Sequence, residues 1–129
     1  MTERALADTS VFIAREAQRP IDTKALPDRM AVSVITIGEL RAGVLAATDA
    51  VIRDRRLDTL TAALSLEPIP IDVEVANAWA RLRLVLRDED LRMPVNDSWI
   101  AATAMALDVP IVTQDDDFPS LAGLNVINV

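Results

Sequence analysis

The chain has 129 residues, of which 51% are hydrophobic, enough to bury a sizeable core. We therefore expect a single domain over residues 1–129. The sequence contains no cysteine and no histidine, which excludes disulfides, thiolate or imidazole metal sites and serine–histidine triads. Any chemistry must come from carboxylates, hydroxyls, arginines or a bound cofactor.

Twenty acidic residues against 13 basic ones give a net charge of −7. This balance opposes unspecific attraction to nucleic acid, because that affinity comes largely from cation–phosphate contacts. A nucleic-acid substrate remains compatible with it if cations fill an acidic site and arginines line its rim. No apolar run approaches the roughly 20 residues of a transmembrane helix, and no signal-peptide pattern opens the chain. We expect no membrane contact and a cytoplasmic protein.

The N-terminal half begins with a predicted buried strand over residues 5–7 that ends at Asp8. Thr9 and Ser10 offer N-cap oxygens for a helix through about residue 17. A second strand is predicted over residues 30–34. Thr36 and Glu39 have the spacing of a capping box, which predicts a helix that opens at Thr36 and continues through residue 45.

Helices dominate the middle of the chain. A helix is predicted over residues 50–64, with Ile52, Leu57, Leu60 and Leu64 near helical spacing. Residues 66–71 are interpreted as a short edge strand, because two prolines would damage an interior ladder. Asp72 is predicted to cap a helix over residues 73–87, whose expected buried stripe consists of Val75, Trp79, Leu82 and Leu86.

The C-terminal part contains a small-residue helix around Asp97 that ends near residue 107, a strand over residues 110–113, an acidic turn and a last strand around residues 125–129. Strands therefore alternate with helices. This predicts an α/β fold with a mostly parallel, twisted sheet of four to five strands, covered by helices on both faces.

Several carboxylates follow the predicted strands. Each has a structural alternative, since caps, first helical turns and tight turns are usual places for acids. In a parallel sheet, however, the loops that leave the strands share one edge, where Asp8, Glu39 and Asp115 would meet and where Asp97 could join them from its helix. Such acids would repel one another by several kcal/mol per close pair. A hard divalent cation such as Mg²⁺ or Mn²⁺ would neutralise them.

The four segments that carry these acids resemble the motifs of PIN-domain ribonucleases, in particular the VapC toxins of bacterial toxin–antitoxin pairs. They are LADTSVF at residues 6–12, IGELRAG at 37–43, NDSWIAATA at 96–104 and TQDDDF at 113–118. The set occurs in order and spans the chain. The resemblance implies a PIN-like three-layer fold, with catalytic, metal-binding roles for Asp8, Glu39, Asp97 and Asp115. Asp117 would be an auxiliary metal-binding acid, whereas Asp116 would face solvent.

The implied activity is that of a Mg²⁺- or Mn²⁺-dependent endoribonuclease that cleaves RNA with metal-activated water and so inhibits translation and growth. Thr9 and Thr113 would contact the acids or the RNA phosphate, although helix capping explains them equally well. Arg15 and Arg41 are candidate phosphate contacts, with a solvated helix face as the favoured alternative. The implied partners are the RNA substrate, a VapB-like antitoxin and a second copy in a homodimer, with a higher toxin–antitoxin assembly as an extension.

Three interpretations stay open. The chain could be a catalytically silent PIN-fold binding module in which the acids hold a structural ion and an antitoxin. Trp79 and Trp99 could be base-stacking platforms, but at helical spacing among apolar neighbours we favour core positions. Several apolar residues could line a groove for the antitoxin, but we favour core packing for each of them: Leu40, Val44, Leu45, Ile52 and Leu60.

Overall fold

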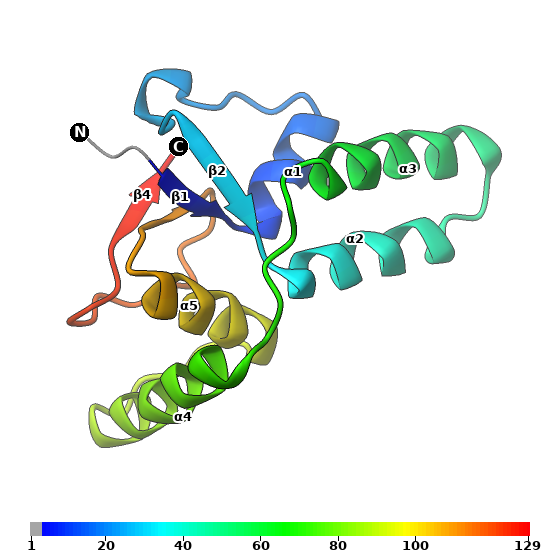
Figure 1. The fold of residues 1–129 in the computed structure, drawn as a ribbon. Helices are drawn as coiled ribbons and strands as arrows, with labels where there is room; N and C mark the ends of the chain where they lie inside the picture. The colour runs from blue at the N-terminus through cyan, green and yellow to red at the C-terminus, as the bar shows by residue number, and fades with distance from the viewer. Residues whose placement is uncertain (1–3) are drawn as a thin grey trace.

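The computed structural model describes residues 4–129. Four strands form its sheet: β1 (Arg4–Ala7), β2 (Arg29–Val32), β3 (Ile111–Thr113) and β4 (Val126–Asn128). Their order is β2-β1-β3-β4, and each neighbouring pair is parallel (Figure 1). The predicted parallel sheet is confirmed, with four strands among the described residues.

The helices are α1 (Thr9–Glu16), α2 (Val34–Ala46), α3 (Ala50–Leu64), α4 (Val73–Asp88) and α5 (Val95–Leu107), with a short 3-10 helix over Thr23–Ala25. In Figure 1, α2 and α3 lie side by side and project from the sheet as an arm, while α4 and α5 pack together as a lobe on another side. Within residues 4–129, no helix combines the length and apolar character that a bilayer crossing requires.

Both faces of the sheet are covered, because successive residues of a strand point to opposite faces. Leu6 of β1 packs with Leu82 of α4 and Ile100 of α5 in one cluster. Its neighbour Ala7 packs in another cluster with Phe12 of α1 and with residues of α2 and α3. The sheet therefore lies between two helical layers, as predicted.

Two predicted element boundaries are wrong. Residues 66–71 form no strand, only an isolated parallel bridge between Ser33 and Ile69, since Pro68 and Pro70 cannot donate ladder hydrogen bonds. The capping box is also wrong: α2 begins at Val34, and Ser33 caps it by accepting a hydrogen bond from the Ile35 amide. Thr36 is instead fully buried inside the helix.

The arm is less buried than its apolar spacing predicts. Leu60 is inside, but Ile52, Leu57 and Leu64 of α3 are 36–43% exposed. Of the candidate groove residues, Leu40, Val44 and Leu60 belong to the core, whereas Leu45 and Ile52 are exposed. The lobe follows its prediction more closely, since Val75, Leu82 and Leu86 are buried, although Trp79 is only half-buried.

Candidate active site

Asp8 stands at the carboxyl end of β1 and is almost fully buried, with 1% of its surface exposed. It is itself the N-cap of α1, in place of the predicted Thr9 or Ser10. Three donors reach its Oδ2 atom: the Ser10 amide at 3.4 Å, the Ser10 hydroxyl at 2.7 Å and the Thr113 hydroxyl at 2.9 Å. These bonds fix one carboxylate oxygen and do not use the other.

Glu39 reaches the same edge from α2. The Thr9 hydroxyl donates to Glu39 Oε1 at 2.7 Å and lies 2.8 Å from the Thr36 hydroxyl. The side-chain amide of Asn96 donates to Glu39 Oε2 over a longer 3.4 Å. Thr9 follows Asp8 in the chain, and Asn96 precedes Asp97. Through its hydrogen bonds to these two residues, Glu39 is held near both of the other candidate acids.

The acidic turn after β3 is attached to the same network. The Asp115 amide donates to the Thr113 hydroxyl at 2.9 Å, and the Gln114 amide donates to the Ser10 hydroxyl at 3.0 Å. Ser10 and Thr113 also lie 3.1 Å apart at their hydroxyl oxygens. The start of α1 and the end of β3 are thus held together at the sheet edge.

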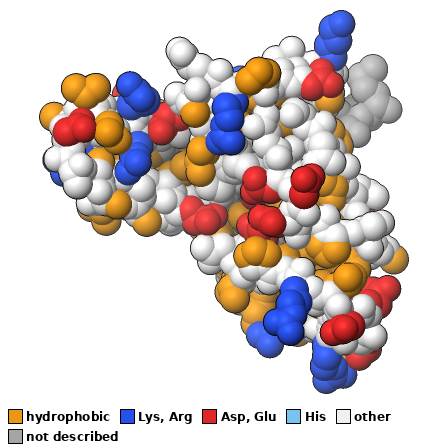
Figure 2. Space-filling model, turned by 180° about the vertical axis from the view of Figure 1, so that it is seen from behind, with side chains coloured by type: hydrophobic (Ala, Val, Ile, Leu, Met, Phe, Trp, Pro, Cys, Tyr) orange, Lys and Arg blue, Asp and Glu red, His pale blue; other side chains and the backbone are white. Residues whose placement is uncertain are grey.

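The remaining acids are coupled to this edge by charge. Burial and neighbouring carboxylates raise the pKa of Asp97 from 3.8 to about 7, the neighbours being Asp8, Asp117, Glu39 and Asp115 in decreasing order of effect. Burial is also the first cause that raises the pKa of Asp115, followed by the charges of Asp8 and Asp117, while Arg19 opposes the rise. Figure 2 shows acidic side chains gathered where the arm meets the rest of the molecule.

The structure therefore brings Asp8, Glu39, Asp97, Asp115 and Asp117 to one edge. Asp116 is exposed, as expected. Arg15 and Arg41 are exposed on α1 and α2, a position that suits both a phosphate contact and a solvated helix face. Their role stays a prediction.

The donor set fits a hard divalent cation, because it consists of carboxylate oxygens and the chain has no histidine or cysteine to favour a softer ion. Across residues 4–129, however, no three acids already converge closely enough to hold an ion. The acids are near enough for their charges to raise the pKa of Asp97, but not near enough to share an ion. Mutual repulsion between carboxylates accounts for this separation.

Comparison with known proteins gives the family. The sequence model of the PIN domain matches residues 5–124. The chain belongs to the PIN domain family. Its relatives include Ribonuclease VapC5 of Mycobacterium tuberculosis (strain ATCC 25618 / H37Rv), 47% identical over 95% of this chain and 90% of the relative. Ribonuclease VapC4 of the same strain is 50% identical over 98% of this chain and 97% of the relative.

A solved structure supports the same assignment of the PIN domain. The crystal structure of VapBC-5, a member of the VapBC family of toxin–antitoxin systems from Mycobacterium tuberculosis, superposes with a TM-score of 0.90 at 43% identity. The match covers 98% of this chain and 99% of the other. The fold expected from the sequence resemblance is therefore confirmed over nearly the whole chain.

Sequence reasoning missed several residues of the site in this PIN domain. Ser10 and Thr36 were interpreted only as helix caps, but their hydroxyls bond Asp8 and Thr9. Arg19 had no assigned role, yet its charge acts on Asp115. The signal for Ser10 was its position two residues after Asp8, where a hydroxyl can bond the capping carboxylate.

Proposed function

We propose that this PIN domain is a metal-dependent endoribonuclease that acts as the toxin of a toxin–antitoxin pair. The observation that carries the proposal is the network that joins three distant segments around one acidic edge: Thr113 bonds Asp8, and Thr9 bonds Glu39. The family assignment and relatives named Ribonuclease VapC4 and VapC5 support RNA as the substrate.

In this proposal Asp8, Glu39, Asp97 and Asp115 hold Mg²⁺ or Mn²⁺, and Asp117 assists them. The ion supplies Lewis-acid activation of water and screening of the phosphate charge. Ser10 and Thr113 orient the Asp8 carboxylate through Oδ2, and Thr9 orients Glu39 through Oε1. By resemblance to the family, the products carry 5′-phosphate and 3′-hydroxyl ends.

A VapB-like antitoxin is the proposed partner, and a homodimer is the proposed toxin unit, acting on RNA in the cytoplasm. The arm offers the antitoxin an apolar surface, since Leu45 is 76% and Val51 70% exposed. A cavity of about 230 Å³ on the same arm is lined in part by Ile13, Leu40 and Glu39 and so includes one acid of the acidic edge. An extended peptide with hydrophobic and basic residues would match both.

The test expresses the protein without antitoxin and compares growth with that of Asp8→Asn and Asp97→Asn at equal protein level. Arrest that both variants relieve supports the proposal. Asp72→Asn is the matched control, because Asp72 caps α4 away from this network and asparagine caps helices equally well. Undiminished arrest in both site variants would overturn these roles for Asp8 and Asp97.

The purified protein should cleave RNA with Mg²⁺ or Mn²⁺ and stop when a chelator is added. Among the described residues, no three acids lie close enough together to hold an ion, which gives one reason to consider the silent binding module. That module would bind the antitoxin yet leave RNA intact in every cation tested. Cleavage that is indifferent to chelator would instead contradict the metal-dependent mechanism.

A further inference from the structure

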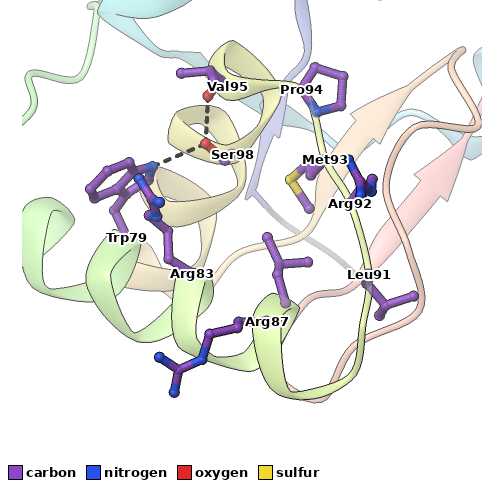
Figure 3. A pocket seen from close by; sticks show the side chains of 10 residues that line it. Trp79, Arg83, Arg87, Leu91, Arg92, Met93, Pro94, Val95 and Ser98 are labelled. Atoms are coloured by element: carbon purple, nitrogen blue, oxygen red, sulfur yellow. Dashed lines mark hydrogen bonds between the residues drawn. The ribbon is translucent and has the colours of Figure 1, made fainter.

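A cavity of about 580 Å³ lies between α4 and the first turn of α5 (Figure 3). Its ten lining residues include three arginines and no acidic residue, although the chain as a whole carries a net charge of −7. The arginines are Arg83 and Arg87 of α4 and Arg92 of the segment that leads to α5. This concentration of positive charge is not used by the mechanism above.

One of these arginines lies over a pair of stacked aromatic rings. The rings of Trp79 and Trp99 stack with their centroids 4.2 Å apart and an angle of 2° between their planes. The guanidinium carbon of Arg83 lies 4.8 Å from the centroid of Trp79. Since Trp99 occupies one face of Trp79, Arg83 covers the other, and the planar edge of its guanidinium group remains able to donate hydrogen bonds.

Hydrogen bonds connect this wall of the cavity to the first turn of α5, the turn that carries Asp97. The indole N–H of Trp79 donates to the Ser98 hydroxyl at 3.0 Å, and that hydroxyl donates to the carbonyl of Val95 (Figure 3). Val95 and Ser98 line the cavity and flank Asp97 within one turn of α5. The cavity and the acidic edge thus share the first turn of α5, which supplies residues to both.

We propose that this cavity binds the backbone of the single-stranded RNA whose cleavage takes place at the acidic edge, with Arg83 and Arg92 binding phosphates next to the cleaved bond. The inference rests on the ribonuclease function proposed above. An RNA strand that crosses an acidic site needs cations on its flank, and arginine binds phosphate in a fork. The Trp99–Trp79–Arg83 column also offers a planar surface to an unpaired base.

The test compares Arg83→Gln/Arg92→Gln with Arg55→Gln/Arg81→Gln. Arg55 and Arg81 are exposed arginines outside this cavity, so both pairs change the net charge equally. Arg87 is left in place because it already lies 3.4 Å from Asp88. Both pairs are made in the Asp8→Asn background, and binding of a fluorescent single-stranded oligouridylate of about twelve nucleotides is measured by anisotropy.

We expect the cavity pair to weaken binding by about tenfold and the control pair by less than about twofold. The slope of log affinity against log salt should become shallower by about 1.4 for the cavity pair, at about 0.7 for each lost phosphate contact in a single strand. Arg83→Lys/Arg92→Lys should recover part of the affinity, because it restores the charge without the fork.

Equal binding by both pairs would overturn the inference. So would a loss of affinity that tracks dissociation of a dimer in sedimentation velocity, which would assign the cavity to a second copy of the chain. Weaker capture of the antitoxin with unchanged RNA binding would assign the cavity to an acidic segment of the antitoxin, separate from the basic segment proposed for the acidic edge. RNA cleavage by the wild-type protein is measured in parallel, so failure of the ribonuclease proposal is seen separately from failure of this one.

Discussion

The acidic edge has two halves, Asp8 on one side and Asp97 with Asp115 on the other, and their carboxylates lie in different environments. Asp8 is 1% exposed and receives three hydrogen bonds from Ser10 and Thr113. Asp97 and Asp115 are half-buried, and burial first, then the charges of neighbouring carboxylates, raises the pKa values of both. One half is positioned by hydrogen bonds, and the other consists of carboxylates whose ionisation is disfavoured by burial and by neighbouring charge.

The two halves therefore differ in what their acids contribute to folding stability and to cation binding. Hydrogen bonds to a buried carboxylate stabilise the folded chain and also orient the group. Like charges gathered at an edge cost stability, but they create the affinity for a divalent cation. Replacing an acid in either half should reduce activity, whereas the effect on folding should have opposite sign in the two halves.

The largest effect is expected for Asp8→Asn and Asp97→Asn, each of which should lower the rate of RNA cleavage by at least about 100-fold. Their stabilities should diverge. Asp8→Asn loses charge-assisted hydrogen bonds and should cost about 1.5–3 kcal/mol, while Asp97→Asn removes a repelled charge and should stabilise the protein at neutral pH. Urea unfolding in the presence of chelator measures this. Destabilisation by both variants to the same extent would remove the distinction between the halves.

Thr113→Val tests how far the buried half depends on its hydroxyl groups. This substitution keeps the shape but removes the donor to Asp8 and the acceptor for the Asp115 amide. We expect a loss of about 1–3 kcal/mol of stability and of about 10–100-fold in cleavage rate. Thr103→Val is the control, because Thr103 is equally buried but only donates to the Trp99 carbonyl of its own helix. Equal activity in the two variants would contradict an orienting role for Thr113.

The two halves also differ in how well the sequence predicts them. Asp8 follows a short apolar run, and parallel strands share an edge, so its meeting with Asp115 could be expected from the pattern alone. The partner hydroxyls could not. Ser33 and Thr36 are both acceptable caps for α2, and only the position where β2 ends decides that Ser33 takes the role. Thr36 then becomes an internal residue that bonds Thr9.

The tryptophans show the same limit on the outer side of the site. Their helical spacing favoured core positions, yet both are half-buried, and Trp79 lines the basic cavity. Spacing identifies the face of α4 that meets α5 but not how far the lobe extends past the sheet. The exposure of Ile52 and Leu57 on the arm has a similar origin, since α3 packs mainly on α2.

The repelled half should show itself in the pH dependence of stability. Because the pKa of Asp97 is raised to about 7 in the folded protein, the folded state binds more protons than the unfolded state between about pH 4 and 7. Without divalent cation, the unfolding midpoint should therefore fall as the pH rises through this window. The fall should be smaller in Asp97→Asn and in wild type with excess Mg²⁺. A wild-type profile that coincides with that of Asp97→Asn would contradict the raised pKa of Asp97.

The smallest effect is expected for Asn96→Ala, which lies between the halves. Asn96 donates to Glu39 Oε2 over 3.4 Å at an exposed site, whereas Thr9 donates to Oε1 over 2.7 Å from a buried position. We expect Asn96→Ala to change the cleavage rate by less than about twofold and Thr9→Val by about 10-fold or more, since a long, solvated hydrogen bond orients its acceptor weakly. Thr9→Ser, which keeps the hydroxyl, should recover most of the activity. If Asn96→Ala instead matches Thr9→Val, then Glu39 is positioned from the α5 side, and the hydrogen-bonded half ends at Asp8.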